Sequence, residues 1–236
     1  MSIQGIQIEN LSKCFGEGDT AVFALKDVNM QVAPGEVVGL IGPSGSGKST
    51  LLKCLGAVID PTAGRMVLDQ QVIYDKGWKV GDLSALRRDK IGFVFQSPYL
   101  IPFLDATDNV ALLPMLAGVP NDEARRRALE LLTALDVQHR AKAMPSQLSG
   151  GEQQRIAIAR GLVSQPPVIL ADEPTAPLDS VRAMAVVRIL NDMAKRFNTA
   201  VIVVTHDEKI IPTFKRIYHI RDGVTHEEVG EGRLPS

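Results

Sequence analysis

A glycine-rich segment early in the chain carries the residue types needed to bind phosphate. Residues 42–50 read Gly-Pro-Ser-Gly-Ser-Gly-Lys-Ser-Thr and match the pattern G-x-x-x-x-G-K-[ST]. They follow an apolar run at 37–41, typical of a buried strand, and a helix is predicted to begin near Lys48. Glycines let the backbone curl around phosphates with its N–H groups pointing inward, and a helix N-terminus attracts anions. The segment therefore predicts a nucleotide-binding loop.

Two side chains of this loop have distinct expected roles. Lys48 can reach the β- and γ-phosphates, and the hydroxyl of Ser49 is a hard oxygen ligand suited to Mg²⁺. A glycine-rich turn without a ligand is the alternative, and it is disfavoured because strand, motif and helix coincide. The predicted nucleotide-binding residues are Gly42, Pro43, Ser44, Gly45, Ser46, Gly47, Lys48, Ser49 and Thr50.

Two adjacent carboxylates follow a second apolar run at 168–171. Asp172 is expected to bind Mg²⁺, directly or through water. Glu173 is expected to lie beside the γ-phosphate, where a carboxylate can orient and polarise the attacking water. Taken alone, the pair could simply cap a helix, but its combination with Lys48 favours ATP hydrolysis.

A third segment, Ser-Gly-Gly-Glu at 149–152, predicts a second anion site. Ser149 is a good N-cap, and the two glycines open a helix whose free N–H groups and dipole attract negative charge. Leu148 to Arg155, followed by Ile-Ala-Ile-Ala-Arg, resembles the signature motif of ABC ATPases. The rest of the chain follows that family's order, because Gln96 resembles its Q-loop residue, Asp179 its D-loop residue and His206 its H-loop residue.

The resemblance covers nearly the whole chain and implies its fold. We expect an α/β P-loop NTPase fold with a RecA-like, mostly parallel core, an antiparallel β subdomain and a helical signature subdomain at about residues 97–165. Residues 1–236 would form a single ABC nucleotide-binding domain.

The resemblance also implies how the motifs work together. Ser149, Gly150, Gly151 and Glu152 would grip the γ-phosphate of ATP held by a second copy, so that a head-to-tail homodimer encloses two nucleotides. Asp179 would communicate between the two ATP sites. For Ser-Gly-Gly alone, a capped helix without a ligand would be the simpler interpretation.

Three further residues receive roles from the same resemblance. His206 follows an apolar run at 200–204 and would contact the γ-phosphate and hold the attacking water. Gln96 would contact Mg²⁺ or water through its amide oxygen and sense the nucleotide as the helical segment swings. Phe15 stands where the family carries an aromatic that stacks on adenine, although a core phenylalanine is the alternative. We therefore expect Glu173, His206 and Gln96 to be catalytic, and Ser49, Gln96 and Asp172 to hold the metal.

The patterns of apolar residues predict the elements that position these groups. Alternation at 3–8 and 28–32 is typical of antiparallel strands, and Asp222-Gly223 predicts a hairpin between 216–220 and a strand from Val224. Between residue 97 and about 145 the spacing changes to that of helices, with one apolar face and an arginine run at 125–127 on a solvated face. A mostly parallel buried sheet is predicted from four continuous apolar runs: 37–41, 91–95, 168–171 and 200–204.

Composition narrows the functional classes. The 236 residues carry 26 Lys and Arg against 27 Asp and Glu, and only 5% are aromatic, which disfavours non-specific nucleic-acid binding. The longest weakly charged stretch, 91–104, is too short and polar to span a bilayer, and the first residues lack the pattern of a secretory signal. Cys14 and Cys54 match no metal or redox spacing and are expected to be reduced thiols. We expect a cytoplasmic protein.

Within the family, the chain resembles the ATPases of macrolide-export, lipoprotein-release and heterocyst-glycolipid-export systems. That resemblance implies a bacterial subunit that is peripheral on the cytoplasmic face of the inner membrane. Its partner would be an integral membrane permease with a large extracytoplasmic domain. The apolar stretch at 99–104 either helps to form the groove for that partner's cytoplasmic helix or is buried under the helical segment.

Two other functions remain open. One is a nucleotide-gated scaffold that controls a cell-envelope complex without transport. The other is an ABC protein of translation or DNA repair. It is disfavoured because such proteins tend to carry two ATPase modules, or coiled-coil or zinc insertions, and 236 residues hold none of these.

Two positions depart from the family pattern. Glu152 stands where many members have glutamine, but glutamate is common in one branch and need not impair binding. Pro177, where this branch usually has asparagine, is the more unusual position. Proline fixes φ, lacks an N–H and restricts the preceding Ala176, so we expect a stiffer D-loop and slower or less coupled hydrolysis.

A Pro177→Asn variant should therefore hydrolyse ATP faster or more cooperatively, because asparagine restores the backbone freedom that proline removes. Steady-state ATPase rates measured over a range of ATP concentrations test this. An unchanged rate together with unchanged cooperativity would contradict it.

Overall fold

The computed structural model describes residues 5–176 and 178–232, so Pro177 lies outside the described residues. One of its two sheets is antiparallel and has four strands. Its order is β2-β1-β4-β5. The strands predicted at 3–8 and 28–32 are antiparallel as expected, although residues 3 and 4 lie outside the described residues. Both strands extend beyond the predicted ranges, because bulges after Ile8 and Leu11 interrupt the alternation that reveals a strand. The four strands are β1 (Ile6–Phe15), β2 (Val22–Val32), β4 (Ala63–Leu68) and β5 (Gln71–Asp75).

The second sheet confirms the mostly parallel core. Its order is β10-β9-β3-β8-β7-β6, and every neighbouring pair is parallel except β9 with β10. The central strands are buried on both faces, which explains their continuous apolar runs. The six strands are β3 (Val37–Ile41), β6 (Ile91–Val94), β7 (Val168–Asp172), β8 (Ala200–Val204), β9 (Arg216–Arg221) and β10 (Val224–Val229).

Two hairpins show why one was predicted and the other was missed. Asp222 and Gly223 take φ of 50° and 80° and join β9 to β10, as the sequence predicts. Asp69 and Gln70 take φ of 48° and 67° between β4 and β5, without a glycine to signal the turn.

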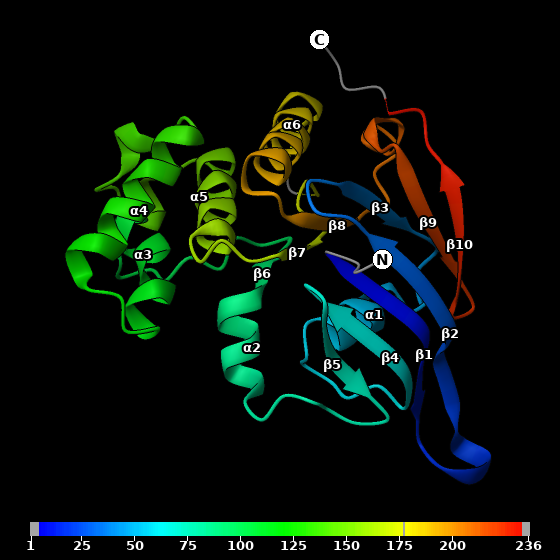
Figure 1. The fold of residues 1–236 in the computed structure, drawn as a ribbon. Coiled ribbons are helices and arrows are strands. Elements are labelled where there is room, and N and C mark those ends of the chain that lie inside the picture. The colour runs from blue at the N-terminus through cyan, green and yellow to red at the C-terminus, as the bar shows by residue number, and fades with distance from the viewer. Residues whose placement is uncertain (1–4, 177, 233–236) are drawn as a thin grey trace.

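Three of the helices pack against one another. In Figure 1, α3, α4 and α5 lie together on one side of the sheets, within the segment expected to form the helical subdomain. The predicted apolar face of α4 is buried, whereas Arg125, Arg126 and Arg127 pair with surface carboxylates. The sequence analysis did not predict α2. The helices are α1 (Lys48–Leu55), α2 (Leu83–Lys90), α3 (Ala106–Leu116), α4 (Asn121–Ala134), α5 (Gly150–Leu162) and α6 (Ser180–Phe197), with 3₁₀ turns η1 (Gly18–Thr20), η2 (Gln138–Arg140), η3 (Pro145–Gln147) and η4 (Ile211–Thr213).

Neither cysteine forms a disulfide within the described residues. Cys14 and Cys54 are free, and burial raises the pKa of the Cys54 thiol to about 12. In the described ranges, no helix has both the length and the apolar character needed to cross a bilayer.

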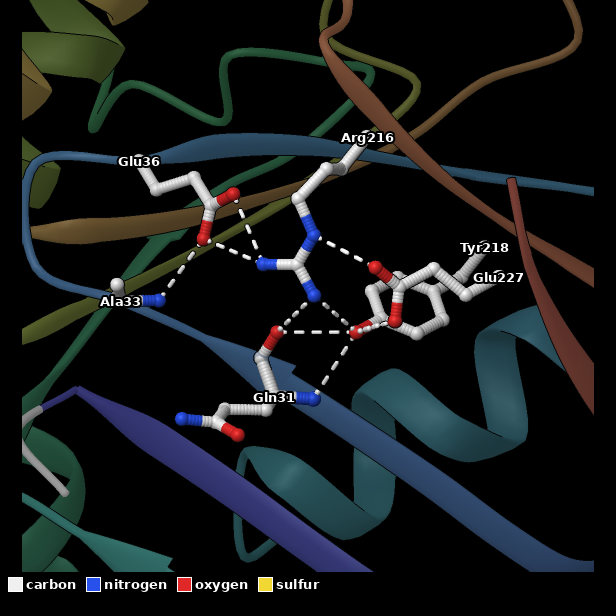
Figure 2. Close-up of polar contacts among 6 residues, drawn as sticks. All are labelled: Gln31, Ala33, Glu36, Arg216, Tyr218 and Glu227. Carbon is white, nitrogen blue, oxygen red and sulfur yellow. Dashed lines mark hydrogen bonds and ion pairs between the residues drawn. The ribbon is translucent and has the colours of Figure 1, made fainter. Parts of the chain in front are cut away.

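A network around Arg216 joins the two sheets (Figure 2). Its guanidinium donates to both carboxylate oxygens of Glu36, at 2.9 and 2.8 Å, and through Nε to Glu227 Oε1 at 2.7 Å. The hydroxyl of Tyr218 donates to the carbonyl of Gln31 on β2 at 3.0 Å. The network therefore holds the β9–β10 hairpin against the end of β2 and the start of β3.

Replacing Arg216 with methionine should lower the free energy of unfolding by about 2 kcal/mol, because it leaves two carboxylates without their shared cation in a partly exposed site. The Arg216 guanidinium holds the pKa of Glu227 below its usual range. A depressed carboxyl pKa stabilises the fold above the unfolded pKa, and this contribution is lost as the pH falls through the folded pKa. The difference between parent and variant should therefore shrink from about pH 5 towards pH 3.

Urea denaturation over this pH range measures both effects. Arg65→Met is the matched control, because Arg65 makes a single ion pair with Glu9 at 3.0 Å on the sheet surface. It should change the free energy by less than about 1 kcal/mol. Equal losses in the two variants would contradict the role of the Arg216 network.

Candidate active site

The glycine-rich loop connects β3 to α1, as predicted, and close packing explains two of its glycines. Gly47 has φ of 110°, and a Cβ there would lie 2.5 Å from the carbonyl oxygen of Ala24. A Cβ on Gly42 would lie 2.1 Å from the carbonyl oxygen of Ile220. Neighbouring strands β2 and β9 therefore leave no room for side chains at these positions.

The turn of the β9–β10 hairpin is hydrogen-bonded to this loop and to β2. The N–H of Gly223 donates to the carbonyl of Ser46 at 3.1 Å, and the N–H of Lys26 donates to the carbonyl of Gly223 at 2.8 Å. The Nζ of Lys48 donates to the carbonyls of Gly42 and Pro43 at 2.7 and 2.8 Å. These bonds keep the Lys48 ammonium over the loop.

The predicted catalytic residues and most of the loop line one cavity of about 640 Å³. Strands β7 and β8 end here side by side, which brings the carboxylates and His206 to the loop. Sequence analysis did not select Ala24 and Val204, which contribute to the wall, whereas the predicted Ser46 is buried behind it. The lining residues are Ala24, Gly42, Pro43, Ser44, Gly45, Gly47, Lys48, Ser49, Thr50, Gln96, Asp172, Glu173, Val204 and His206.

The two carboxylates have different surroundings. Burial raises the pKa of Asp172, and the nearby Glu173 raises it further, while Lys48 and Lys53 oppose the shift. Glu173 has φ of 49°, its N–H donates to the carbonyl of Val204 at 2.9 Å, and its side chain is only 15% exposed. Its Oε1 lies 2.6 Å from Nδ1 of His206, whose side chain is 73% exposed. His206 therefore contacts the carboxylate predicted to activate water.

The second predicted anion site lies in a separate cavity of about 240 Å³, lined in part by Ser149, Gly151 and Glu152. The N–H of Ser149 donates to Glu152 Oε2 at 2.7 Å, while the N–H of Glu152 donates to Ser149 Oγ at 3.4 Å. This reciprocal capping box begins α5, as predicted. Asp179 caps α6 by accepting from the N–H of Arg182 at 3.0 Å.

Comparison with known proteins identifies the family that combines these features. Residues 25–176 match the family model described as ABC transporter. The chain belongs to the ABC transporter family. It is an ATP-binding and ATP-hydrolysing subunit of that family.

Individual relatives of this ABC ATPase agree with the predicted branch. It is 39% identical over 225 residues to the lipoprotein-releasing system ATP-binding protein LolD of Idiomarina loihiensis, covering 95% of this chain and 98% of LolD. It is 44% identical over 224 residues to the macrolide export protein MacB of Chromobacterium violaceum, covering 94% of this chain but only 34% of MacB.

A solved structure agrees with the fold. The dimeric ATP-binding cassette MJ0796, in a post-hydrolysis state bound to ADP and Pi, matches with a TM-score of 0.82 and 39% identity. The match covers 97% of this chain and 99% of that one. The MJ0796 protein belongs to Methanocaldococcus jannaschii.

The predicted adenine-stacking residue of the ABC ATPase stands apart from the main cavity. Phe15 does not line it, and Lys13 Nζ lies 4.9 Å from the centre of the Phe15 ring. The side chain of Phe15 is 46% exposed, so it is not a core phenylalanine.

Two residues that the sequence analysis did not single out tie α5 to the segment carrying Gln96. The buried Gln154 donates through Nε2 to the carbonyl of Phe95 at 3.2 Å. Arg160 donates to the carbonyls of Pro98 and Tyr99, both at 2.7 Å, and burial lowers its pKa. The sequence does contain a signal for these two residues, because both stand among the apolar residues of α5. A polar side chain that is buried there needs a hydrogen-bond partner.

Glu173→Gln should bind ATP but hydrolyse it at least about a hundredfold more slowly, because the amide cannot accept a proton from water. Lys48→Ala should instead weaken ATP binding itself by about tenfold or more, since a charge-assisted contact to phosphate is lost. Equilibrium nucleotide binding and phosphate release measure the two effects separately.

Glu208→Gln is the matched control for the first substitution, because Glu208 is exposed near His206 but does not line the cavity. It should hydrolyse ATP at the parent rate. Near-normal turnover of Glu173→Gln would refute the role of Glu173, and unchanged ATP affinity of Lys48→Ala would refute that of Lys48.

Proposed function

We propose that two copies of this ABC ATPase close head to tail around two ATP molecules. The observation that carries the proposal is that the glycine-rich loop and the signature residues line separate cavities of one chain. Each half-site is an anion site by its backbone chemistry, and a twofold dimer lets each copy complete the other's site. The dimeric MJ0796 cassette supports this arrangement.

The residues of the main cavity suit MgATP. Ser49, Gln96 and Asp172 offer the hydroxyl, amide and carboxylate oxygens that Mg²⁺ prefers, and all three line the same cavity. The ion, when bound, neutralises charge developing on the phosphates. Lys48 binds the β- and γ-phosphates, and the loop N–H groups surround them.

Hydrolysis then depends on two contacting side chains. Glu173 orients the attacking water and accepts its proton, and the contact with His206 fixes the direction of that carboxylate. His206 is the more exposed of the pair and lies where it can also contact the γ-phosphate. Gln96 reports the state of the nucleotide to α5 through the segment that Gln154 and Arg160 hold.

The work of this cycle is passed to a separate membrane permease. A cavity of about 540 Å³ lies between α2, β6 and α3, and its wall is mostly apolar. Tyr99, 70% exposed, lies at this cavity, and Phe103 is exposed nearby, whereas Leu100 packs on the core. The segment 99–104 is therefore partly buried and partly open, as a docking groove for an amphipathic helix requires.

The names of LolD and MacB support an export or envelope role. The chain covers LolD almost completely but about a third of MacB, which combines ATP-binding and permease parts. We propose that the partner is a permease with an extracytoplasmic domain, and that this subunit is peripheral on the cytoplasmic face of the membrane.

The test is affinity purification of the Glu173→Gln protein with ATP and Mg²⁺ from detergent-solubilised membranes of its source cells, followed by mass spectrometry. A membrane protein with few spanning helices and a large extracytoplasmic domain should co-purify. When Leu112→Glu is added to Glu173→Gln, the membrane protein should no longer be recovered, because a carboxylate would enter the apolar groove. The protein that carries Leu112→Glu alone should keep its basal ATP hydrolysis.

Leu129→Glu is the matched control, because Leu129 is partly exposed on α4 and does not line the groove. It should retain the partner. Recovery of only soluble proteins would overturn the transport proposal, and recovery that resists Leu112→Glu would overturn the groove as the docking site.

A further inference from the structure

The signature motif of this chain contains a negative charge at the end of the helix that is proposed to bind phosphate. Glu152 is the third residue of α5, whose N-terminus otherwise offers free N–H groups. An ionised carboxylate at this place would repel a phosphate unless its charge were compensated. The structure shows how that compensation is made.

Two side chains from η2 lie against Glu152. Arg140 Nε is 3.1 Å from Glu152 Oε1, and His139 Nε2 is 3.6 Å from the same oxygen. The Glu152 side chain is only 16% exposed, and its other oxygen accepts the N–H of Ser149. Hydrogen bonds from Ser149 and the nearby Arg140 and His139 hold the pKa of Glu152 below its usual range, so the group is a carboxylate at neutral pH.

The two partners of Glu152 differ in what they contribute. His139 is mostly exposed and lies farther from the Glu152 carboxylate than Arg140 does. Arg140 is permanently charged, and its guanidinium also donates to the carbonyl of Gln147, just before the signature. Arg140 is therefore the side chain that can cancel the charge and fix the carboxylate at the same time.

We infer that Arg140 is a positioning residue for ATP-driven dimerisation. It neutralises Glu152 and holds its carboxylate back on the N–H of Ser149, so that the remaining N–H groups of the signature face the phosphate of the partner copy. This inference rests on the proposed head-to-tail dimer, because it concerns the second half of that shared site.

If Arg140 has a purely structural role, the effect of replacing it should not depend on the residue at position 152. Its bond to Gln147 would stabilise the segment before α5 whatever residue stands at position 152. Charge neutralisation matters only while position 152 is anionic. A double-mutant cycle between Arg140 and Glu152 separates the two roles.

The experiment uses the hydrolysis-deficient Glu173→Gln protein and measures ATP-dependent dimerisation by analytical ultracentrifugation. Adding Arg140→Gln should raise the ATP concentration for half-maximal dimerisation by about tenfold, because the phosphate then meets an uncompensated carboxylate. The other half of the cycle compares two proteins that both carry Glu152→Gln. The one that also carries Arg140→Gln should need an ATP concentration within about twofold of the one that keeps Arg140. Arg140→Lys should lose less than Arg140→Gln, since it retains the charge.

Arg126→Gln is the matched control, because it also removes an arginine that pairs with glutamates. The partners of Arg126 are Glu123 and Glu130, which belong to α4 and not to the signature. It should not change dimerisation. Binding of ATP to the monomer should also be unaffected by Arg140→Gln, since Arg140 does not line the main cavity.

The outcomes separate the two proposals. If Glu173→Gln itself stays monomeric with saturating ATP, the head-to-tail dimer is overturned. If it dimerises and Arg140→Gln has no effect, or has the same effect with and without Glu152→Gln, the dimer stands and the role of Arg140 is overturned.

Discussion

The close approach of the glycine-rich loop to two neighbouring strands is the constraint on which the rest of the structure depends. Gly42 packs on the backbone of β9, and Gly47 packs on the backbone of β2. A loop held this tightly keeps its N–H groups in a fixed curve, which is what a phosphate site needs. The hairpin of β9 and β10 must therefore be fixed as well, and the Arg216 network fixes it against both sheets. Ion pairs far from the nucleotide thus help to shape its binding site.

The parallel sheet brings together the side chains that are predicted to be catalytic. Strands β7 and β8 end next to each other, so that Glu173 and His206 meet at 2.6 Å although 33 positions separate them in the chain. The exposed histidine and the mostly buried carboxylate form one unit beside the phosphate loop. In the proposed reaction, this contact orients Glu173 as the base.

Helix α5 connects the separate parts of the molecule. Its first turn presents the signature residues, with Glu152 compensated by Arg140, and its middle and last turn hold the Gln96 segment through Gln154 and Arg160. In the proposed dimer, a shift of α5 on contact with the partner's nucleotide would also move the segment that carries Gln96, a proposed Mg²⁺ ligand. The apolar groove is lined in part by Tyr99 of that same segment and by Arg160, so the proposed permease contact lies beside the residues that α5 holds.

The sequence determined the local features whose signals lie within a few residues: the glycine-rich loop, the apolar runs of the parallel sheet, the N-cap Ser149 of α5 and the Asp222-Gly223 turn. It underestimated β1 and β2, whose bulges break the alternation, and it missed the turn at Asp69 and Gln70, which has no glycine. Only the tertiary structure decided that Glu173 contacts His206, that Arg140 compensates Glu152 and that Arg160 holds the Gln96 segment. These contacts join side chains from different elements, and their geometry depends on how the sheets and helices pack rather than on any local pattern.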